Sequence, residues 1–209
     1  MNDLQCAVRV FVARHGEADY ETELLADDGG SLSAAGRSQS RALAETLAGE
    51  RIAHVLSSSM SRAVQTAEIV AARLGVDVTV REGLREFSVG SFVGQTGDPD
   101  PFRETFDSWL DGDLDAAIAG GESGSQVVDR VRGVLDEVAD RFRGEAVLVV
   151  SHGGAICTAV PNLARNLDRR HPLGRPLANC DVVELAADAD GWVARSWAGT
   201  PVPMVGTIR

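Results

Sequence analysis

The sequence is poor in cysteine, and its few cysteines are not arranged to build a disulfide or zinc site. The 209 residues include Cys6, Cys157 and Cys180, which lie far apart and form no Cys-x-x-Cys motif. Three cysteines at this spacing argue against a disulfide framework or a cysteine-rich zinc site. The four histidines form no His-Glu-x-x-His motif either, so we expect no bound metal and no cofactor.

Long apolar runs and excess positive charge are also missing. No stretch approaches the roughly 18 apolar residues of a membrane span, and residues 1–12 lack the basic start and apolar run of a signal peptide. We therefore expect a cytoplasmic protein. The formal net charge of −11 repels nucleic acid and anionic membranes, so neither is an expected partner. An anionic substrate would need a local cluster of arginine and histidine.

The rest of the composition is ordinary for a globular protein, with 44% hydrophobic and 24% charged residues, and the length suits one domain. β-branched apolar runs predict strands over residues 7–13, 53–57, 76–80, 146–150, 182–186 and 192–196. Apolar spacing of three and four predicts helices over residues 34–49, 59–74, 102–110 and 122–143, and from residue 155 onward. Ser33 suits an N-cap and Gly75 a helix end. This alternation predicts an α/β domain with a mostly parallel sheet.

Two of the predicted strands end in a His-Gly pair, His15-Gly16 and His152-Gly153. In sheets of this kind, ligands bind beyond the carboxyl ends of the strands. The sequences around the two pairs differ, which favours one shared site over an internal duplication.

Six short motifs follow one another between about residues 8 and 160. They are Arg14-His15-Gly16-Glu17, residues 32–37 (LSAAGR), residues 58–67 (SSMSRAVQTA), Leu84-Arg85-Glu86 with Gly90, Gly121-Glu122-Ser123 and residues 151–154 (SHGG). This ordered set resembles the histidine phosphatase superfamily, in its phosphoglycerate mutase-like branch 1. The resemblance implies a three-layer α/β/α sandwich and a single domain over residues 1–209, with a substrate-specificity insertion at about 91–121.

Metal-free phosphoryl transfer needs a nucleophile, cations on the equatorial oxygens and an acid for the leaving group. His15 can present a neutral ring nitrogen for in-line attack, and Gly16 leaves room for a close approach of backbone and ligand. Arg14 and Arg62 provide planar, permanently charged groups that suit phosphate. The resemblance implies the same roles.

The acid and the remaining phosphate contacts come from other segments. Glu86 is the candidate general acid and base, provided that burial raises its pKa. His152 can donate hydrogen bonds to the phosphoryl group when protonated, and Gly153 beside it is a further candidate substrate-binding residue. A surface ion pair of Glu86 with its neighbours Arg85 and Glu82 stays an alternative.

Several motif residues also have purely structural interpretations. Ser58 can line the phosphate site or make a plain turn, and Glu122 and Ser123 can cap the long helix. His54 and His171 have no partner motif and are expected to be structural or at the surface. In many members of the family a polar Asn follows the Arg-His-Gly motif. Here Tyr20-Glu21 lies near that place, and we expect Tyr20 to pack on the substrate.

The residues after Glu86 bear on the function. True mutases of this family resemble Glu-Arg-His-Tyr-Gly at this point, whereas this chain has Glu86-Phe87-Ser88-Val89-Gly90 and an acidic segment 97–121. We expect a phosphatase acting on a small phosphorylated metabolite through a phosphohistidine. A phosphoglycerate mutase-type phosphotransfer, a non-catalytic phosphate-binding module and a phosphoprotein substrate are the alternatives.

Specificity is expected from residues 83–121 and the C-terminal segment. Phe87, Phe92, Phe102 and Trp109 could form an apolar wall there or belong to the core. The strand over residues 182–186 is expected near a sheet edge, where it could support a homodimer.

Overall fold

The computed structural model describes residues 7–188 and 190–204, so Cys6 lies outside the described residues. A seven-stranded sheet forms the centre, with the strand order β5-β4-β6-β1-β7-β8-β9. Pairing is parallel from β5 to β1 and antiparallel from β1 to β9. The strands are β1 (Arg9–Arg14), β4 (Ile52–Ser57), β5 (Val78–Val80), β6 (Ala146–Ser151), β7 (Val182–Asp188), β8 (Gly191–Trp197) and β9 (Thr200–Pro201).

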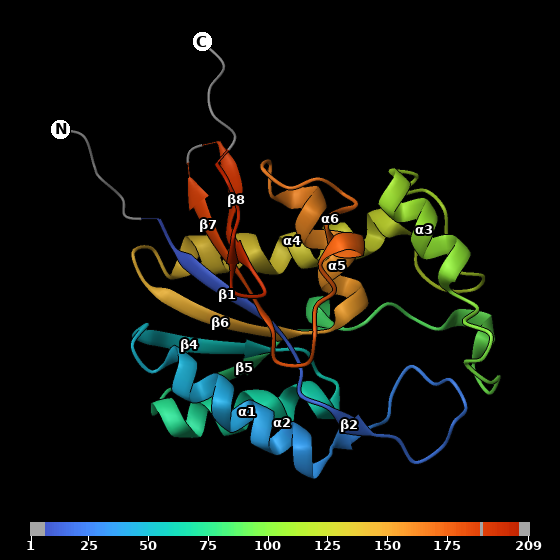
Figure 1. Ribbon diagram of the computed structural model, residues 1–209, viewed down its shortest axis with the longest axis horizontal. Helices are drawn as coiled ribbons and strands as arrows, with labels where there is room; N and C mark the ends of the chain where they lie inside the picture. Colours follow the sequence, from blue (N-terminus) through green and yellow to red (C-terminus); the bar gives the residue numbers. More distant parts are fainter. Residues whose placement is uncertain (1–6, 189, 205–209) are drawn as a thin grey trace.

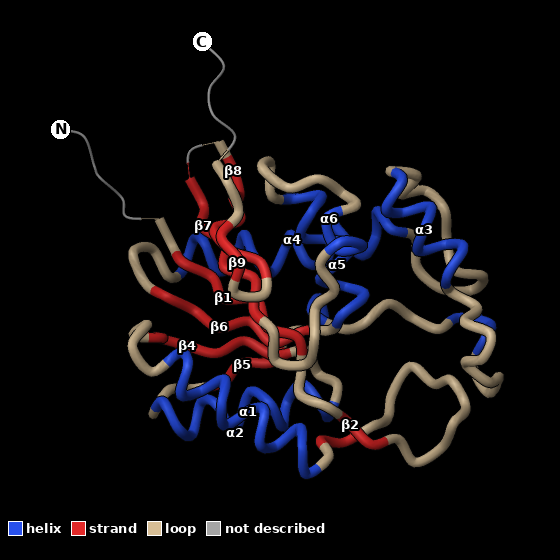
Figure 2. Tube along the Cα trace, viewed as in Figure 1, coloured by secondary structure: helices blue, strands red, loops and turns tan. Residues whose placement is uncertain are grey.

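Helices cover both faces of this sheet, as Figures 1 and 2 show. On one face lie α1 (Ala34–Leu47) and α2 (Ser61–Leu74), and on the other α4 (Gly124–Arg141) and α5 (Gly153–Leu163). Side chains alternate along β1, so Phe11 and Ala13 join the core under α1 and α2, whereas Val10 and Val12 join the core under α4 and α5. The three-layer α/β/α sandwich with a mostly parallel sheet is confirmed.

The ends of the helices follow their local sequence. The Ser33 side chain accepts a hydrogen bond from Gly36 N at the start of α1, and Gly75 ends α2 at a φ of 70°. Ser123 and Gln126 form a reciprocal capping box at the start of α4. The predicted N-cap at Ser33 and helix end at Gly75 are confirmed, whereas α4 is two residues shorter at each end than the predicted 122–143.

Two irregular segments meet beyond the carboxyl ends of β1, β4 and β6, on the right of Figure 1. One is residues 20–30, which link the short antiparallel strands β2 (Ala18–Asp19) and β3 (Ser31–Leu32). The other holds η1 (Glu82–Leu84), η2 (Gly90–Phe92) and α3 (Arg103–Asp111). Main-chain hydrogen bonds join the two segments, from Leu25 N to Gln95 O and from Gly94 N to Leu25 O.

The sequence did not reveal the short elements β2, β3, β9 and α6 (His171–Gly174). The expected edge position of residues 182–186 is wrong, because β7 pairs with β1 on one side and with β8 on the other. Within the described residues no helix is long and apolar enough to cross a membrane.

Candidate active site

His15 follows β1 directly and is 6% exposed. Its Nδ1 lies 2.6 Å from the carbonyl oxygen of Gly16, and its Nε2 lies 3.2 Å from the Nε–H of Arg62. A carbonyl can only accept and a guanidinium can only donate. The proton of the neutral ring is therefore assigned to Nδ1, and Nε2 carries the free lone pair.

The surroundings of His15 keep its ring neutral. Its pKa is lowered to about 4, mainly by burial and to a smaller extent by the charges of Arg62 and Arg14, while the hydrogen bond to the Gly16 carbonyl acts in the opposite direction. A buried imidazole with its lone pair on Nε2 can act as a nucleophile without first losing a proton.

Two guanidinium groups flank this ring. Arg62, in the first turn of α2, is 6% exposed and also donates from Nη1 to the carbonyl of Gly29. Arg14 donates from Nη1 to the carbonyl of Leu177, and its Nε is buried without a partner among the described residues. Both arginines border the same cavity as His15, so a local cluster of positive charge is present in this acidic chain.

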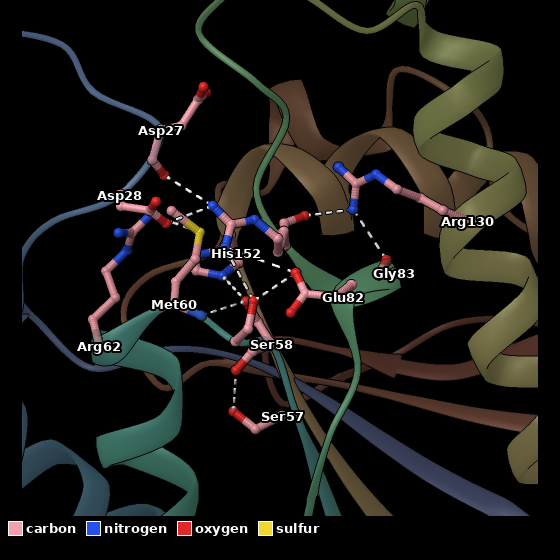
Figure 3. Close-up of polar contacts among 12 residues, drawn as sticks. Asp27, Asp28, Ser57, Ser58, Met60, Arg62, Glu82, Gly83, Arg130 and His152 are labelled. Carbon is pink, nitrogen blue, oxygen red and sulfur yellow. Dashed lines mark hydrogen bonds and ion pairs between the residues drawn. The ribbon is translucent and has the colours of Figure 1, made fainter.

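His152 follows β6 and is fully buried, with its ring centroid 5.0 Å from that of His15. Its Nε2 lies 2.8 Å from Ser58 Oγ, and its Nδ1 has no partner among the described residues (Figure 3). Burial, followed by the charge of Arg62, lowers its pKa well below the usual value. The ring is thus neutral in the free protein, and if Ser58 donates to Nε2, the remaining N–H is on Nδ1. Donation by His152 therefore does not require the protonation expected from the sequence.

The Glu86 carboxylate binds backbone N–H groups at the start of α5 and does not form a surface ion pair. Its Oε1 accepts hydrogen bonds from Ala155 N (2.6 Å) and Phe87 N (3.1 Å), and its Oε2 accepts one from Gly154 N (2.9 Å). Burial raises the pKa of this carboxyl, although these three N–H groups and Arg62 act in the opposite direction. A carboxyl with a raised pKa at the rim of the site can supply and recover a proton.

A brace from α4 holds the segment around Glu86. Arg130 donates from Nη1 to the carbonyl of Gly83 at 3.0 Å (Figure 3) and to that of Arg85 at 2.6 Å. It also forms an ion pair with Glu122 at 2.7 Å. Glu122 in turn accepts from the backbone N–H of Ser88. Backbone on both sides of Glu86 is therefore fixed by one ion pair. Glu122 thus holds Arg130 and the backbone of Ser88, whereas Ser123 caps α4.

Two cavities meet at the site. The first, of about 450 Å³, is lined by Arg14, His15, Arg62, Glu86 and Gly153, together with apolar residues that include Phe106 and Leu173. The second, of about 600 Å³, lies under residues 20–29 and shares Tyr20, Arg62 and Glu86 with the first. We call them the phosphate cavity and the side chamber.

The glycines of the two His-Gly pairs differ in their surroundings. A Cβ on Gly16 would lie 2.7 Å from the carbonyl oxygen of Gly36, so packing against α1 gives a reason for glycine there besides ligand approach. Gly153 lines the phosphate cavity, and a Cβ there would lie 3.3 Å from Arg14 Nε.

Tyr20 and Glu21 occupy the boundary of the two cavities. The Tyr20 ring lies over the guanidinium of Arg62, 5.7 Å from ring centroid to Cζ, and lines both cavities. Glu21 Oε2 accepts a hydrogen bond from Gly30 N, so this carboxylate binds its own loop and lines the side chamber, outside the phosphate cavity.

Residues 177–180, which belong to none of the six motifs, support the site. Asn179 Nδ2 donates to the carbonyl of His15, Cys180 N to that of Arg14, and Leu177 accepts from Arg14. The side chains of His54 and His171 lie elsewhere, His54 against Thr79 and Phe142 and His171 against Trp197. Among the described residues, no group of three or more His, Cys, Asp or Glu is placed to hold a metal ion.

The fold and this site define a class of protein, an α/β enzyme with two histidines and two arginines gathered beyond its strand ends. The model of the histidine phosphatase superfamily (branch 1) matches residues 10–200. The chain belongs to that superfamily and is an enzyme of its kind.

Similar proteins differ in the activity that their names give. "Probable phosphoglycerate mutase GpmB" of Salmonella choleraesuis is 30% identical over 199 residues, covering 91% of this chain and 90% of the relative. A mycobacterial glucosyl-3-phosphoglycerate phosphatase is 27% identical with a TM-score of 0.76, covering 93% of this chain and 100% of its own. YhfR of Bacillus stearothermophilus is 26% identical with a TM-score of 0.77, covering 93% and 98%.

Proposed function

We propose that this protein is a metal-independent phosphatase that hydrolyses a small phosphomonoester through a phosphohistidine at His15. The observation that carries the proposal is the state of His15, a buried neutral ring whose unprotonated Nε2 accepts a hydrogen bond from Arg62. Glu86, with a raised pKa, borders the same cavity. The residues proposed as nucleophile, cations and acid line one cavity, which supports the proposal.

In the first step, the lone pair of His15 Nε2 attacks phosphorus while the ester P–O bond breaks. The leaving alkoxide takes the proton of Glu86, and Arg14 and Arg62 balance the charge on the equatorial oxygens. His152 and Gly153 complete the contacts to the phosphoryl group. Arg14 Nε and His152 Nδ1 support this arrangement, because buried donors without partners are typical of a site that a polar ligand completes.

In the second step, the Glu86 carboxylate takes a proton from water, and the water oxygen attacks phosphorus. The P–N bond breaks, inorganic phosphate leaves, and both His15 and Glu86 return to their starting states.

A phosphoglycerate mutase-type transfer is the second candidate, because the Salmonella relative carries that name. A mutase for phosphoglycerate must bind a carboxylate as well as a phosphoryl group. The residues that line the two cavities include only Arg14 and Arg62 as permanent cations, and both flank His15. This lining favours a phosphatase, in agreement with the mycobacterial phosphatase.

The proposal includes a cytoplasmic location. It also includes a role for residues 91–121 in substrate specificity, since Phe102 and Phe106 from this segment line the cavities. The partner is a small phosphorylated molecule, with no role for nucleic acid or membrane. A homodimer stays a proposal without support from β7, which is an interior strand.

Hydrolysis of p-nitrophenyl phosphate tests the proposal, measured between about pH 4 and 8 with EDTA present, for the wild type and for His15→Ala. Turnover that survives EDTA and disappears in the variant is the expected result. Turnover that requires an added divalent ion, or that is unchanged in His15→Ala, would contradict the proposal.

A further inference from the structure

The side chamber opens from the point where the leaving group of a phosphomonoester has to lie. It shares Arg62 and Glu86 with the phosphate cavity. Glu86 is the residue that protonates the leaving oxygen in the function proposed above, on which this inference rests. An alcohol whose oxygen reaches Glu86 therefore has the side chamber directly beside it. The volume of about 600 Å³ is within the range that binds small molecules.

One wall of the side chamber is apolar and packs on a buried tryptophan. Phe87 and Phe102 line it and contact each other edge to face, with ring centroids 5.4 Å apart. Behind them, Trp109 is 1% exposed and packs against Phe87 at 5.6 Å. The two alternatives predicted for these aromatic residues therefore both apply. Trp109 belongs to the core, whereas Phe87 and Phe102 line the cavity. Such a surface favours an apolar body in the ligand.

The opposite wall is formed by residues 20–29 and is acidic. Its lining carboxylates are Glu21, Glu23, Asp27 and Asp28. Asp28 is paired with Arg85, whereas Asp27 accepts a hydrogen bond from Val89 N and Glu21 one from Gly30 N. Backbone donors orient Asp27 and Glu21 but bring no full positive charge. Arg85 and Arg62 offset two of the four carboxylates, so the lining of the chamber keeps a net negative charge.

Hydrogen bonds hold this acidic wall against the aromatic one. Leu24 and Leu25, which also line the side chamber, pair through their backbone with Gln95 and Thr96. Arg85 donates to Asp28 Oδ1 and to the carbonyl of Asp27 (Figure 3). The two walls therefore form one cavity of defined shape.

We propose that the side chamber binds the alcohol part of the substrate and selects an apolar alcohol that carries an amino group over a similar alcohol that carries a carboxylate. The apolar body packs on Phe87 and Phe102, and the ammonium group faces the carboxylates of residues 21–28. A carboxylate at the same position meets like charges, which disfavours its binding.

Three esters of matched size test this proposal: 4-(aminomethyl)benzyl, 4-methylbenzyl and 4-carboxybenzyl phosphate, assayed near pH 6, where the amine and the carboxylate are both charged. The charged group lies across the ring from the ester, so the three leaving oxygens are chemically similar. We expect kcat/KM to fall in the order given, with at least about tenfold between the amine and the carboxylate. Equal values or the reverse order would overturn the inference.

A charge-removing variant locates the source of the preference. Asp27→Asn keeps the oxygen that accepts from Val89 N and removes one negative charge, so the ratio of kcat/KM for amine over carboxylate should fall about threefold. Asp140→Asn, on the exposed face of α4, removes the same charge far from the side chamber and should leave that ratio unchanged. Equal effects of both variants would show that the preference comes from the overall net charge and would overturn the inference.

The outcomes separate this inference from the proposed function. If p-nitrophenyl phosphate and all three benzyl esters are inert, the phosphatase proposal fails, and the inference fails with it. If p-nitrophenyl phosphate is hydrolysed but the benzyl esters are refused or show no charge preference, only the inference fails.

Discussion

Burial of the neutral His15 ring should make the stability of the fold depend on acid by an amount that follows from its pKa. The pKa is about 4 in the folded protein, against an ordinary value of 6.5. Between these values the unfolded chain binds a proton at this position that the folded protein does not, so stability falls as the pH falls. With about 1.36 kcal/mol per pKa unit, the loss is about 2 kcal/mol near pH 5 and about 3 kcal/mol near pH 4.

The comparison that isolates this loss is between the wild type and His15→Asn, unfolded in urea and followed by tryptophan fluorescence from about pH 7 to pH 4. His152 titrates in both proteins, so its contribution largely cancels. The variant should gain on the wild type by about 2 kcal/mol between pH 7 and pH 5. Thr158→Val, which changes a buried hydroxyl without a titrating group, should run parallel to the wild type. A constant difference between His15→Asn and the wild type would refute the neutral burial of His15.

Three further substitutions test the site. Glu86→Gln should lower kcat/KM, which reports phosphohistidine formation, by roughly 10²- to 10⁴-fold for alkyl phosphates and much less for p-nitrophenyl phosphate, whose leaving group needs no proton; equal losses in kcat/KM would contradict an acid role. Arg62→Lys keeps the charge but loses the planar fork, so kcat/KM should fall about 10²-fold or more, and an unchanged value would remove Arg62 from phosphate binding. Gly154→Ala would place a Cβ 2.3 Å from Phe87 Cε1 and 2.8 Å from Glu86 Oε1, so the free energy of unfolding in urea should fall by about 1–3 kcal/mol; full stability would show that these side chains can shift.

The long elements of the fold could be predicted because their apolar periodicity is strong. Val127, Val131 and Val138 recur at helical spacing and are buried on one face of α4. The two-residue strands β2, β3 and β9 are too short to carry a period of two. The order of strands in the sheet does not follow from local sequence pattern either, so the interior position of residues 182–186, with β8 and β9 outside them, could not be predicted.

The positions of the predicted site residues could be anticipated because Arg14, His15 and His152 lie at strand ends, where a parallel sheet gathers them. The contacts that support these residues could not be predicted from the sequence. Asn179 reaches the carbonyl of His15 across 164 positions of sequence through a single side-chain bond, and such a contact leaves no motif. The chamber walls at residues 20–29 likewise depend on backbone pairing with residues 94–96, which composition does not reveal.

The most direct test of the proposed chemistry is to trap the covalent intermediate. The protein is mixed with a ³²P-labelled phosphomonoester in EDTA, quenched in alkali, in which phosphohistidine survives, and digested for mapping of the label. Label on the peptide that contains His15, formed at a rate compatible with turnover and absent from His15→Ala, is the expected result. Turnover without any labelled protein, or label on a residue other than His15, would contradict nucleophilic catalysis by this histidine.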